Sequence, residues 1–536
     1  MSNFDLPIIT PDANPDFTDA KSCAAWLRTV PLINVAPSHG RLLGQLEELN
    51  CFKVESTERL RILELLAEPT AFVQLEHTKK YTGKPVPLAK QEREVFHTVL
   101  ALWDALSLGY QRCLNSIAEG SPALSGQHAL VCQRALWCTG RRLAEHYKSC
   151  QELSDEDWKL LHRIFAIAEG YGVLDKEVIE PAHKARNTTC LQTYVQTLLL
   201  HLASDPSEQS PKQIAIVSRW LERLAQKVRI GRNPPASEPG MVLLALDIAA
   251  GRPPVHKLLS GESVRFLELD ELAKAIRARV SKLQKGDAPE ALGLGDDISA
   301  TAAEQLLLLV YRLWCEGPRT RASTRRAVTV PAQLCTGLPA MHYYISGKPF
   351  RPPVGTQELT KEQGEELATF GRIATRQDDE HSMTHGFVLE SWTIREESLE
   401  GLRIERGDGG GKGRFVQQQL IAVRPADAKT FILGVLRWLS VSEDFDLRTG
   451  VRILPGVVQC VAVRATGLNA MTEKHVQALL LPGVPALQSP ATLILPPGWY
   501  RPKRIVEVFS DKPEQILLTG VVDRGVDFER LSIGPP

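Results

Sequence analysis

The sequence lacks an excess of either charge, and this limits what the chain attracts as a whole. Lysine and arginine together number 63, as do aspartate and glutamate, so the formal net charge is zero. A chain without net charge has no overall electrostatic attraction to nucleic acid or to an anionic membrane. Any anionic ligand must therefore be bound by a local cluster of basic side chains.

Long hydrophobic runs are also missing. Runs such as Met241–Leu246 and Leu306–Val310 are far shorter than the roughly 20 apolar residues that cross a bilayer. The first residues, Met-Ser-Asn-Phe-Asp-Leu-Pro, have neither the basic segment nor the apolar segment of a secretory signal. We therefore expect a cytoplasmic chain with no membrane partner.

The ten cysteines are scattered, and no Cys-x-x-Cys pair is present. Most lie inside apolar helical patterns, which is typical of reduced, buried thiols rather than zinc ligands. His381 and His385 follow an acidic run, but no third ligand occurs at a fixed spacing, so a solvated polar loop is favoured over a metal site. We expect no metal and no cofactor.

Catalytic motifs are absent as well. No Gly-x-Ser-x-Gly elbow occurs, and no Ser, His and Asp set stands in a nucleophile context. The glycine-rich stretch 407–414 fails the phosphate-loop template, because Arg406 holds the place of the first glycine and Gly413 follows Lys412 where Ser or Thr is required. A hairpin loop is favoured there. We expect no catalytic residues and a protein that is not an enzyme.

The first 315 residues carry apolar side chains at helical spacing. A helix over Ser56–Ala67 is expected to stop before Pro69, and Ser210-Pro-Lys-Gln213 has the N-cap, first-turn proline and acceptor of a capping box. The pattern predicts an N-terminal helical domain, a helical hairpin domain and a mixed segment with a connecting helix, over residues 1–125, 126–235 and 236–315.

Beyond Arg326 the pattern changes to short apolar and β-branched runs separated by Gly, Pro and Asp, which predict a small antiparallel barrel. Ala340–Ile345 is among the expected strands, and residues 358–376 are expected to form a helical insertion. We predict an α+β multidomain fold, in which an all-α N-terminal region precedes a β-barrel over 316–465 and a small C-terminal β extension over 466–536.

An arginine cluster marks the junction of the two halves. Residues 319–326 have the sequence Arg-Thr-Arg-Ala-Ser-Thr-Arg-Arg, and the one acid nearby is Glu316. A guanidinium group is planar, permanently charged and presents its donors as a fork, which suits phosphate groups and guanine faces. The cluster therefore favours an anionic ligand at this junction.

Two motifs in this region resemble the signatures of PilZ domains. Arg321-Ala-Ser-Thr-Arg325 stands before an expected strand, like the RxxxR turn of that family, and Glu396-Glu-Ser398-Leu-Glu-Gly401 corresponds to its [Asp/Asn]-x-Ser-x-x-Gly turn. Residues 434–438 and 450–452 resemble later strands of the family. The resemblance covers roughly residues 319–465, and the layout of the chain looks like that of bacterial multidomain PilZ proteins.

The resemblance implies a cytoplasmic receptor for cyclic di-GMP built on a PilZ-like barrel. We further expect a signalling role, in which the helical half contacts an unidentified protein partner and no nucleic acid is bound. In this interpretation the arginines hold guanine and phosphate, while the second turn forms the opposite wall. The residues implied in ligand binding are Arg321, Arg325, Arg326, Glu396, Ser398 and Gly401.

Glu396 departs from the family pattern, which has Asp or Asn at its position. Its extra methylene moves the carboxylate outward, although it can still accept from a guanine N–H group. The sequence therefore leaves an alternative open: a scaffold or chaperone-like interaction protein that binds no nucleotide and whose barrel arginines pair only with neighbouring acids.

Overall fold

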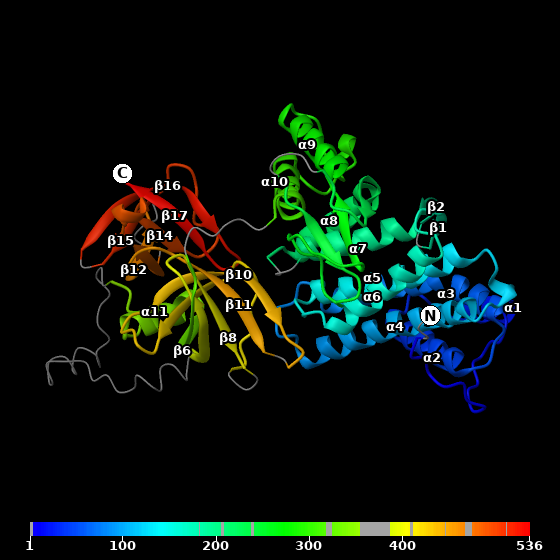
Figure 1. Cartoon of the computed structure of the whole chain (residues 1–536). Helices are drawn as coiled ribbons and strands as arrows, with labels where there is room; N and C mark the ends of the chain where they lie inside the picture. The colour runs from blue at the N-terminus through cyan, green and yellow to red at the C-terminus, as the bar shows by residue number, and fades with distance from the viewer. Residues whose placement is uncertain are drawn as a thin grey trace. The chain divides into compact units, whose positions relative to one another are not determined.

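Most helices lie in the first part of the chain and most strands in the second, as the change in periodicity predicts. A computed structural model describes residues 4–181, 183–204, 208–236, 241–317, 324–353, 386–407, 411–444, 446–466, 474–510 and 512–536 (Figure 1). The chain divides into two units: unit 1 comprises Met1–Lys84 with Leu88–Thr320, and unit 2 comprises Pro85–Pro87 with Arg321–Pro536. The predicted α+β multidomain fold is confirmed.

Unit 1 is built mainly from helices. In chain order they are α1 (Ala20–Leu27), α2 (Val35–Cys51), α3 (Ser56–His77), α4 (Lys90–Ala118), α5 (His128–Lys148), α6 (Asp155–Gly170), α7 (Cys190–Ser204), α8 (Pro211–Leu224), α9 (Asp270–Gln284) and α10 (Ala300–Tyr311). Two small sheets interrupt them, so the region is not purely α-helical. One pairs β1 (Val178–Glu180) with β2 (His183–Thr188), and the other has the order β3 (Arg229–Gly231), β5 (Val264–Glu268), β4 (Leu244–Asp247).

Local sequence signals account for several helix starts. Ser210 Oγ accepts from the N–H of Gln213, whose side chain accepts from the N–H of Ser210, so the predicted capping box opens α8. The expected stop before Pro69 is wrong, since α3 runs on to His77 with the proline inside it. Leu66, on the face that packs into the core, is fully buried, and this packing outweighs the backbone hydrogen bond that the proline cannot make.

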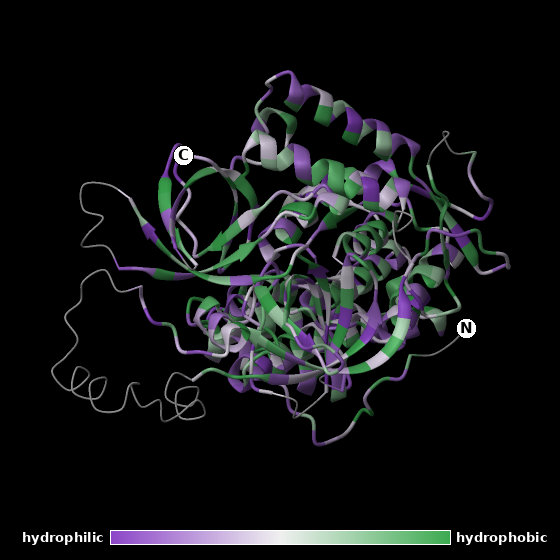
Figure 2. Cartoon of the chain, turned by 90° about the vertical axis from the view of Figure 1, so that its left-hand side faces the viewer, coloured by the Kyte–Doolittle hydropathy of each residue, from purple (hydrophilic) through white to green (hydrophobic). Residues whose placement is uncertain are grey.

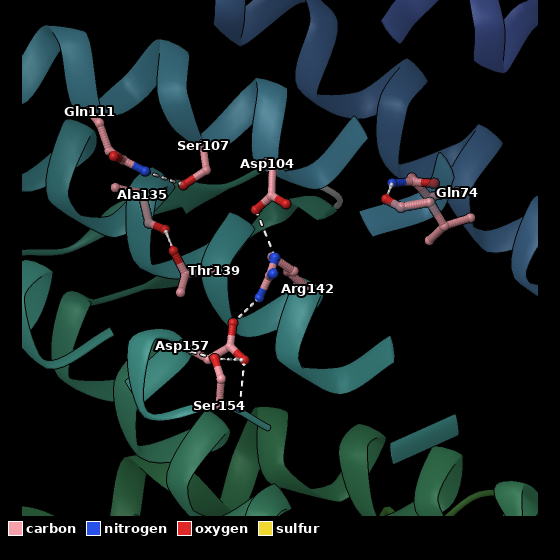
Figure 3. Close-up of polar contacts among 10 residues, drawn as sticks. Gln74, Asp104, Ser107, Gln111, Ala135, Thr139, Arg142, Ser154 and Asp157 are labelled. Carbon is pink, nitrogen blue, oxygen red and sulfur yellow. Dashed lines mark hydrogen bonds and ion pairs between the residues drawn. The ribbon is translucent and has the colours of Figure 1, made fainter. Parts of the chain in front are cut away.

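An ion-pair network ties three helices of unit 1 together (Figure 3). Arg142 of α5 lies between two carboxylates, with its Nε 2.7 Å from Asp104 of α4 and an Nη atom on Asp157 of α6. Ser154, the N-cap of α6, donates from its hydroxyl to Asp157 at 2.8 Å. Burial alone raises the pKa of Asp157, but the Arg142 charge, the nearby His146 and the hydrogen bonds from Ser154 together more than offset this, so its pKa is lowered.

Unit 2 consists of two closed antiparallel barrels joined in sequence. The first has the strand order β10, β11, β8, β7, β6, β9, and the second has the order β12, β13, β14, β17, β16, β15. The strands of the first barrel are β6 (Arg326–Thr336), β7 (Glu390–Glu397), β8 (Gly401–Arg406), β9 (Leu420–Pro425), β10 (Ile432–Val441) and β11 (Leu447–Ile453). Those of the second are β12 (Gln459–Ala465), β13 (Val476–Leu481), β14 (Thr492–Leu495), β15 (Ile505–Phe509), β16 (Pro513–Arg524) and β17 (Glu529–Gly534).

Along β7 and β8, buried residues alternate with more exposed ones, because one face of each strand is directed into its barrel. The strands of the barrels carry both hydrophobic and hydrophilic residues (Figure 2). A continuous buried cluster joins the two barrels, and it includes Leu433 and Val435 of the first and Leu479, Ile494 and Phe528 of the second. The barrels therefore share a core. Within unit 2, Val86 also pairs with Phe415 in an isolated antiparallel bridge.

The C-terminal region differs from the expected small β extension, because residues 459–534 close into the second barrel. The predicted boundary at 465 falls after β12, yet β12 pairs with β13 and β15 of that barrel. Periodicity identifies a strand but not the sheet it joins, and only a few residues separate β11 from β12. The further divisions expected at residues 125 and 235 remain predictions.

The strand expected at Ala340–Ile345 is wrong, since this segment forms α11 (Leu338–Ser346). Pro339 lies in the first turn, and Leu338 and Met341 pack into the core that the barrels share. A short apolar run fits a buried helix as well as a strand. The helical insertion expected at 358–376 lies outside the described residues. No helix among those described is long and apolar enough to cross a membrane.

The ion-pair network predicts that Arg142→Met destabilises unit 1. Removing the guanidinium leaves Asp157 buried without its counter-charge, which we expect to cost about 2–3 kcal/mol, less than a fully buried pair because Asp104 is 42% exposed. Urea unfolding followed by circular dichroism at 222 nm measures the loss. Arg141→Met is the matched control, since Arg141 forms no ion pair with the described residues. Equal unfolding midpoints for the two variants would contradict the prediction.

Candidate functional site

A tight turn between β7 and β8 forms one edge of the candidate site. The N–H of Ser398 donates to the carbonyl of Gly401 at 2.9 Å, and the Ser398 hydroxyl donates to the same carbonyl at 3.1 Å. The hydroxyl also accepts from the N–H of Gly401 at 3.2 Å. These hydrogen bonds close the turn, so the Ser398 side chain holds the backbone of the hairpin.

Gly401 is required by the close approach of a neighbouring strand. A Cβ atom at this position would lie 2.7 Å from the carbonyl oxygen of Val451 in β11, a distance that side chains essentially never show. The sequence-based interpretation gave this glycine a place beside the ligand. In the structure its missing side chain makes room for the protein's own backbone.

The hairpin register then sets the neighbours of Glu396. With the turn closed at Ser398 and Gly401, Glu396 of β7 pairs with Arg403 of β8. Its carboxylate oxygens accept from two guanidinium groups, from Arg403 at 2.9 Å and from Arg325 at 2.9 Å. Glu396 and Arg325 are each 27% exposed, so the cluster faces solvent in part.

The charges of this cluster do not cancel. Two arginines surround one carboxylate, which leaves one excess positive charge, and hydrogen bonding by Arg325 is the leading cause that lowers the pKa of Glu396. Each guanidinium uses one nitrogen for Glu396, and the described residues supply no other acceptor to either. The cluster can therefore present further N–H groups to an anion.

The other predicted site residues lie differently. Arg326 pairs with Glu397 and is 77% exposed, so it does not join Arg325 on Glu396. Arg321 lies outside the described residues, as do His381 and His385. The structure thus brings Arg325, Glu396 and the Ser398–Gly401 turn together.

Two further side chains extend the cluster across the barrel. In register, Arg403 pairs with Gly450 of β11, and Gly450 pairs with Trp438 of β10. A Cβ atom at Gly450 would collide with the indole of Trp438, so the half-buried ring lies over the glycine, beside the strand that carries Arg403. Sequence reasoning missed Arg403, although counting outward from the turn pairs it with Glu396.

The glycine-rich loop holds an ion pair of the chain itself. Arg406 and Glu390, both 5% exposed, are 2.7 Å apart, and Arg406 donates to the carbonyl of Gly413 at 2.8 Å. The N–H of Gly413 donates to Glu390 at 2.5 Å. Gly413, at the described end of this stretch, and Arg406 thus both bind the buried carboxylate of Glu390. No group of three or more metal-ligating side chains occurs among the described residues, where all ten cysteines are free thiols.

The architecture defines a multidomain α+β protein, in which a helical unit precedes two antiparallel barrels and the first barrel carries an arginine–glutamate cluster on its surface. Residues 21–236, which span α1 to β3, match the family model described as the N-terminal domain of the cyclic-di-GMP receptor FimW. Residues 461–534, within the second barrel, match the model of the FimW C-terminal β-barrel domain.

A curated relative is similar along most of the chain. The cyclic-di-GMP receptor FimW of Pseudomonas aeruginosa is 22% identical over 92% of this chain and 86% of its own length. Both matching models carry the FimW name, so PilZ is the coarser description of the resemblance, and neither of these two models covers the first barrel. The site residues expected there remain a prediction.

The approach of Val451 to Gly401 predicts that Gly401→Ala destabilises unit 2. Backbone atoms must move to admit the methyl group, which we expect to cost about 1–3 kcal/mol. Thermal unfolding of the purified protein measures this loss. Gly407→Ala is the control at the other end of the same hairpin, because a Cβ there meets nothing closer than Asp446 at 3.6 Å. If both variants unfold at the wild-type temperature, the stated role of Gly401 is wrong.

Proposed function

We propose that this chain is a receptor for cyclic di-GMP and that the nucleotide binds on the first barrel beside Arg325, Glu396 and Arg403. The cluster of two guanidinium groups around one carboxylate carries this proposal. The similarity to a receptor of that name, in both the N-terminal region and the second barrel, supports the ligand class.

The chemistry of the cluster matches the parts of the nucleotide. Cyclic di-GMP has two phosphate groups, each with one negative charge, and two guanine bases with flat faces and a polar edge. The unused N–H groups of Arg325 and Arg403 suit phosphate oxygens and the acceptor edge of guanine. The Trp438 ring supplies an aromatic face, on which a base can stack.

Glu396 has two competing tasks in this proposal. In the free protein its carboxylate neutralises part of the charge on the arginines. In the complex it accepts from a guanine N–H group, and the phosphates take over the arginines. The binding free energy is therefore smaller than it would be at two arginines without a carboxylate partner, because the existing ion pairs must be broken when the phosphates bind.

We further propose that the protein acts by binding alone, in solution in the cytoplasm, and that unit 1 presents the surface for a protein partner. No reaction step and no cofactor are needed for such a role. The protein would signal through a change in the populations of its conformations, because the nucleotide binds one conformation more tightly than the others.

A second candidate function, a scaffold that binds no nucleotide, is favoured by one observation. Arg325 already has a carboxylate partner at 2.9 Å, so its charge is satisfied without a ligand. In this alternative the cluster stabilises the β6, β7 and β8 strands, and the helical unit alone carries the interaction with partners.

Isothermal titration of the full chain with cyclic di-GMP distinguishes the two functions. We expect a dissociation constant in the micromolar range or below, weakened at least about tenfold in Arg325→Ala, because charge-assisted hydrogen bonds contribute roughly 1.5–3 kcal/mol. Arg464→Ala is the matched control: Arg464 is also 27% exposed and pairs with a glutamate, Glu507, at 2.7 Å, but in the second barrel.

Each outcome of this titration is informative. Binding that survives in Arg464→Ala and is lost in Arg325→Ala supports the receptor. No heat at high nucleotide concentration, with either the wild type or Glu396→Asp, supports the scaffold. The side chain of the Glu396→Asp variant is shorter by one methylene. If this variant gives binding heat and the wild type gives none, the length of the Glu396 side chain is what prevents nucleotide binding.

A further inference from the structure

Helix α10 leaves one large apolar side chain, Leu308, exposed in the middle of a polar face. Its core-facing residues, Ala303, Leu306, Leu307 and Val310, are 3% exposed or less. Leu308, on the opposite side, is 47% exposed, although it stands in a run of four leucines. A large aliphatic side chain this exposed in a strongly apolar helix is a candidate for contact with another surface.

Leu308 lines one side of a groove between α9 and α10. The groove has a volume of about 650 Å³; Ile276, Val280 and Leu309 are its other aliphatic lining residues, and Arg277 and Glu316 are among its charged ones. A protruding leucine next to an apolar groove is complementary to a second copy of itself. Such a self-complementary patch is what a two-fold symmetric interface requires, because each side must supply both the knob and the hole.

Polar residues of α10, together with Arg312 directly after its last residue, are arranged symmetrically about Leu308. Glu304 lies four residues before it and Arg312 four residues after it, while Gln305 and Tyr311 lie three residues before and after. When two copies of the helix lie antiparallel with their Leu308 residues at the centre, Glu304 of each copy faces Arg312 of the other. The arrangement therefore has two such acid–base contacts. Gln305 then faces the Tyr311 hydroxyl in the same way.

The two charged groups are available for this pairing. Arg312, at the groove, has no carboxylate partner among the residues that the structure describes. One carboxylate oxygen of Glu304 accepts from Gln284 of α9 at 2.8 Å, and this contact is exposed to solvent. Its second oxygen can accept from another molecule.

We propose that α10 docks antiparallel against α10 of a second copy of this chain, with Leu308 near the two-fold axis and each Glu304 paired with Arg312 of the other copy. Each Leu308 enters the groove between α9 and α10 of its partner. One helix hairpin from each chain makes a small interface, below roughly 1,200 Å², so the dimer is reversible and its dissociation constant is in the micromolar range.

Sedimentation velocity of the full chain tests the dimer. We expect the wild type to shift from monomer to dimer between about 1 and 100 µM, and Leu308→Asp to stay monomeric throughout, since it places two carboxylates together on the axis. Leu75→Asp is the matched control: Leu75 is an exposed leucine of α3, 62% exposed, outside the proposed interface. It should dimerise like the wild type.

Charge reversal tests the antiparallel pairing. Glu304→Arg and Arg312→Glu, each alone, place like charges opposite one another and should weaken the dimer at least about tenfold. Mixed together, the two variants again join one acid with one base at each contact, so a heterodimer with wild-type affinity should form. A disturbed helix fold would not be rescued by mixing.

Three outcomes would overturn the proposal. A wild type that stays monomeric at about 100 µM excludes the dimer. A Leu308→Asp variant that dimerises like the wild type places the interface elsewhere. A dimer that depends on Leu308, but whose two charge variants fail to associate when mixed, excludes the antiparallel arrangement.

Discussion

The closed turn at Ser398 and Gly401 is the constraint on which the candidate site depends. A shift of one residue in a β-hairpin moves every side chain to the other face of the sheet. Because the turn is closed by three hydrogen bonds, Glu396 lies opposite Arg403, and its second oxygen is left for Arg325. The turn thus acts through the register, and the register determines which charges meet.

Much of the fold could be predicted from local patterns. The capping box at Ser210 opens α8 as expected, because this signal involves residues only three apart in the chain. The errors arose where tertiary packing decided the outcome. Pro69 is retained inside α3 by the buried face around it, and the Leu338–Ser346 segment became α11 by packing into the core of the two barrels.

The site could be predicted in part. Its two motifs lie some seventy residues apart in sequence, and the contact between Arg325 and Glu396 joins them at 2.9 Å. The sequence also raised pairing of the barrel arginines with neighbouring acids as an alternative, and this pairing is present. The pairing of Arg403 with Glu396 follows from counting outward from the turn. The place of Trp438 could not be seen in a list of motifs, because it depends on which strands are neighbours in the closed barrel.

Hydrogen–deuterium exchange of the full chain, with and without saturating cyclic di-GMP, tests the central claim most directly. If the nucleotide binds at the cluster, backbone amides from Glu396 to Arg403 and at the start of β6 should exchange more slowly in its presence, while β12 to β17 should be unchanged. Protection confined to the second barrel or to the helical unit, with none in the β7–β8 hairpin, would contradict this account.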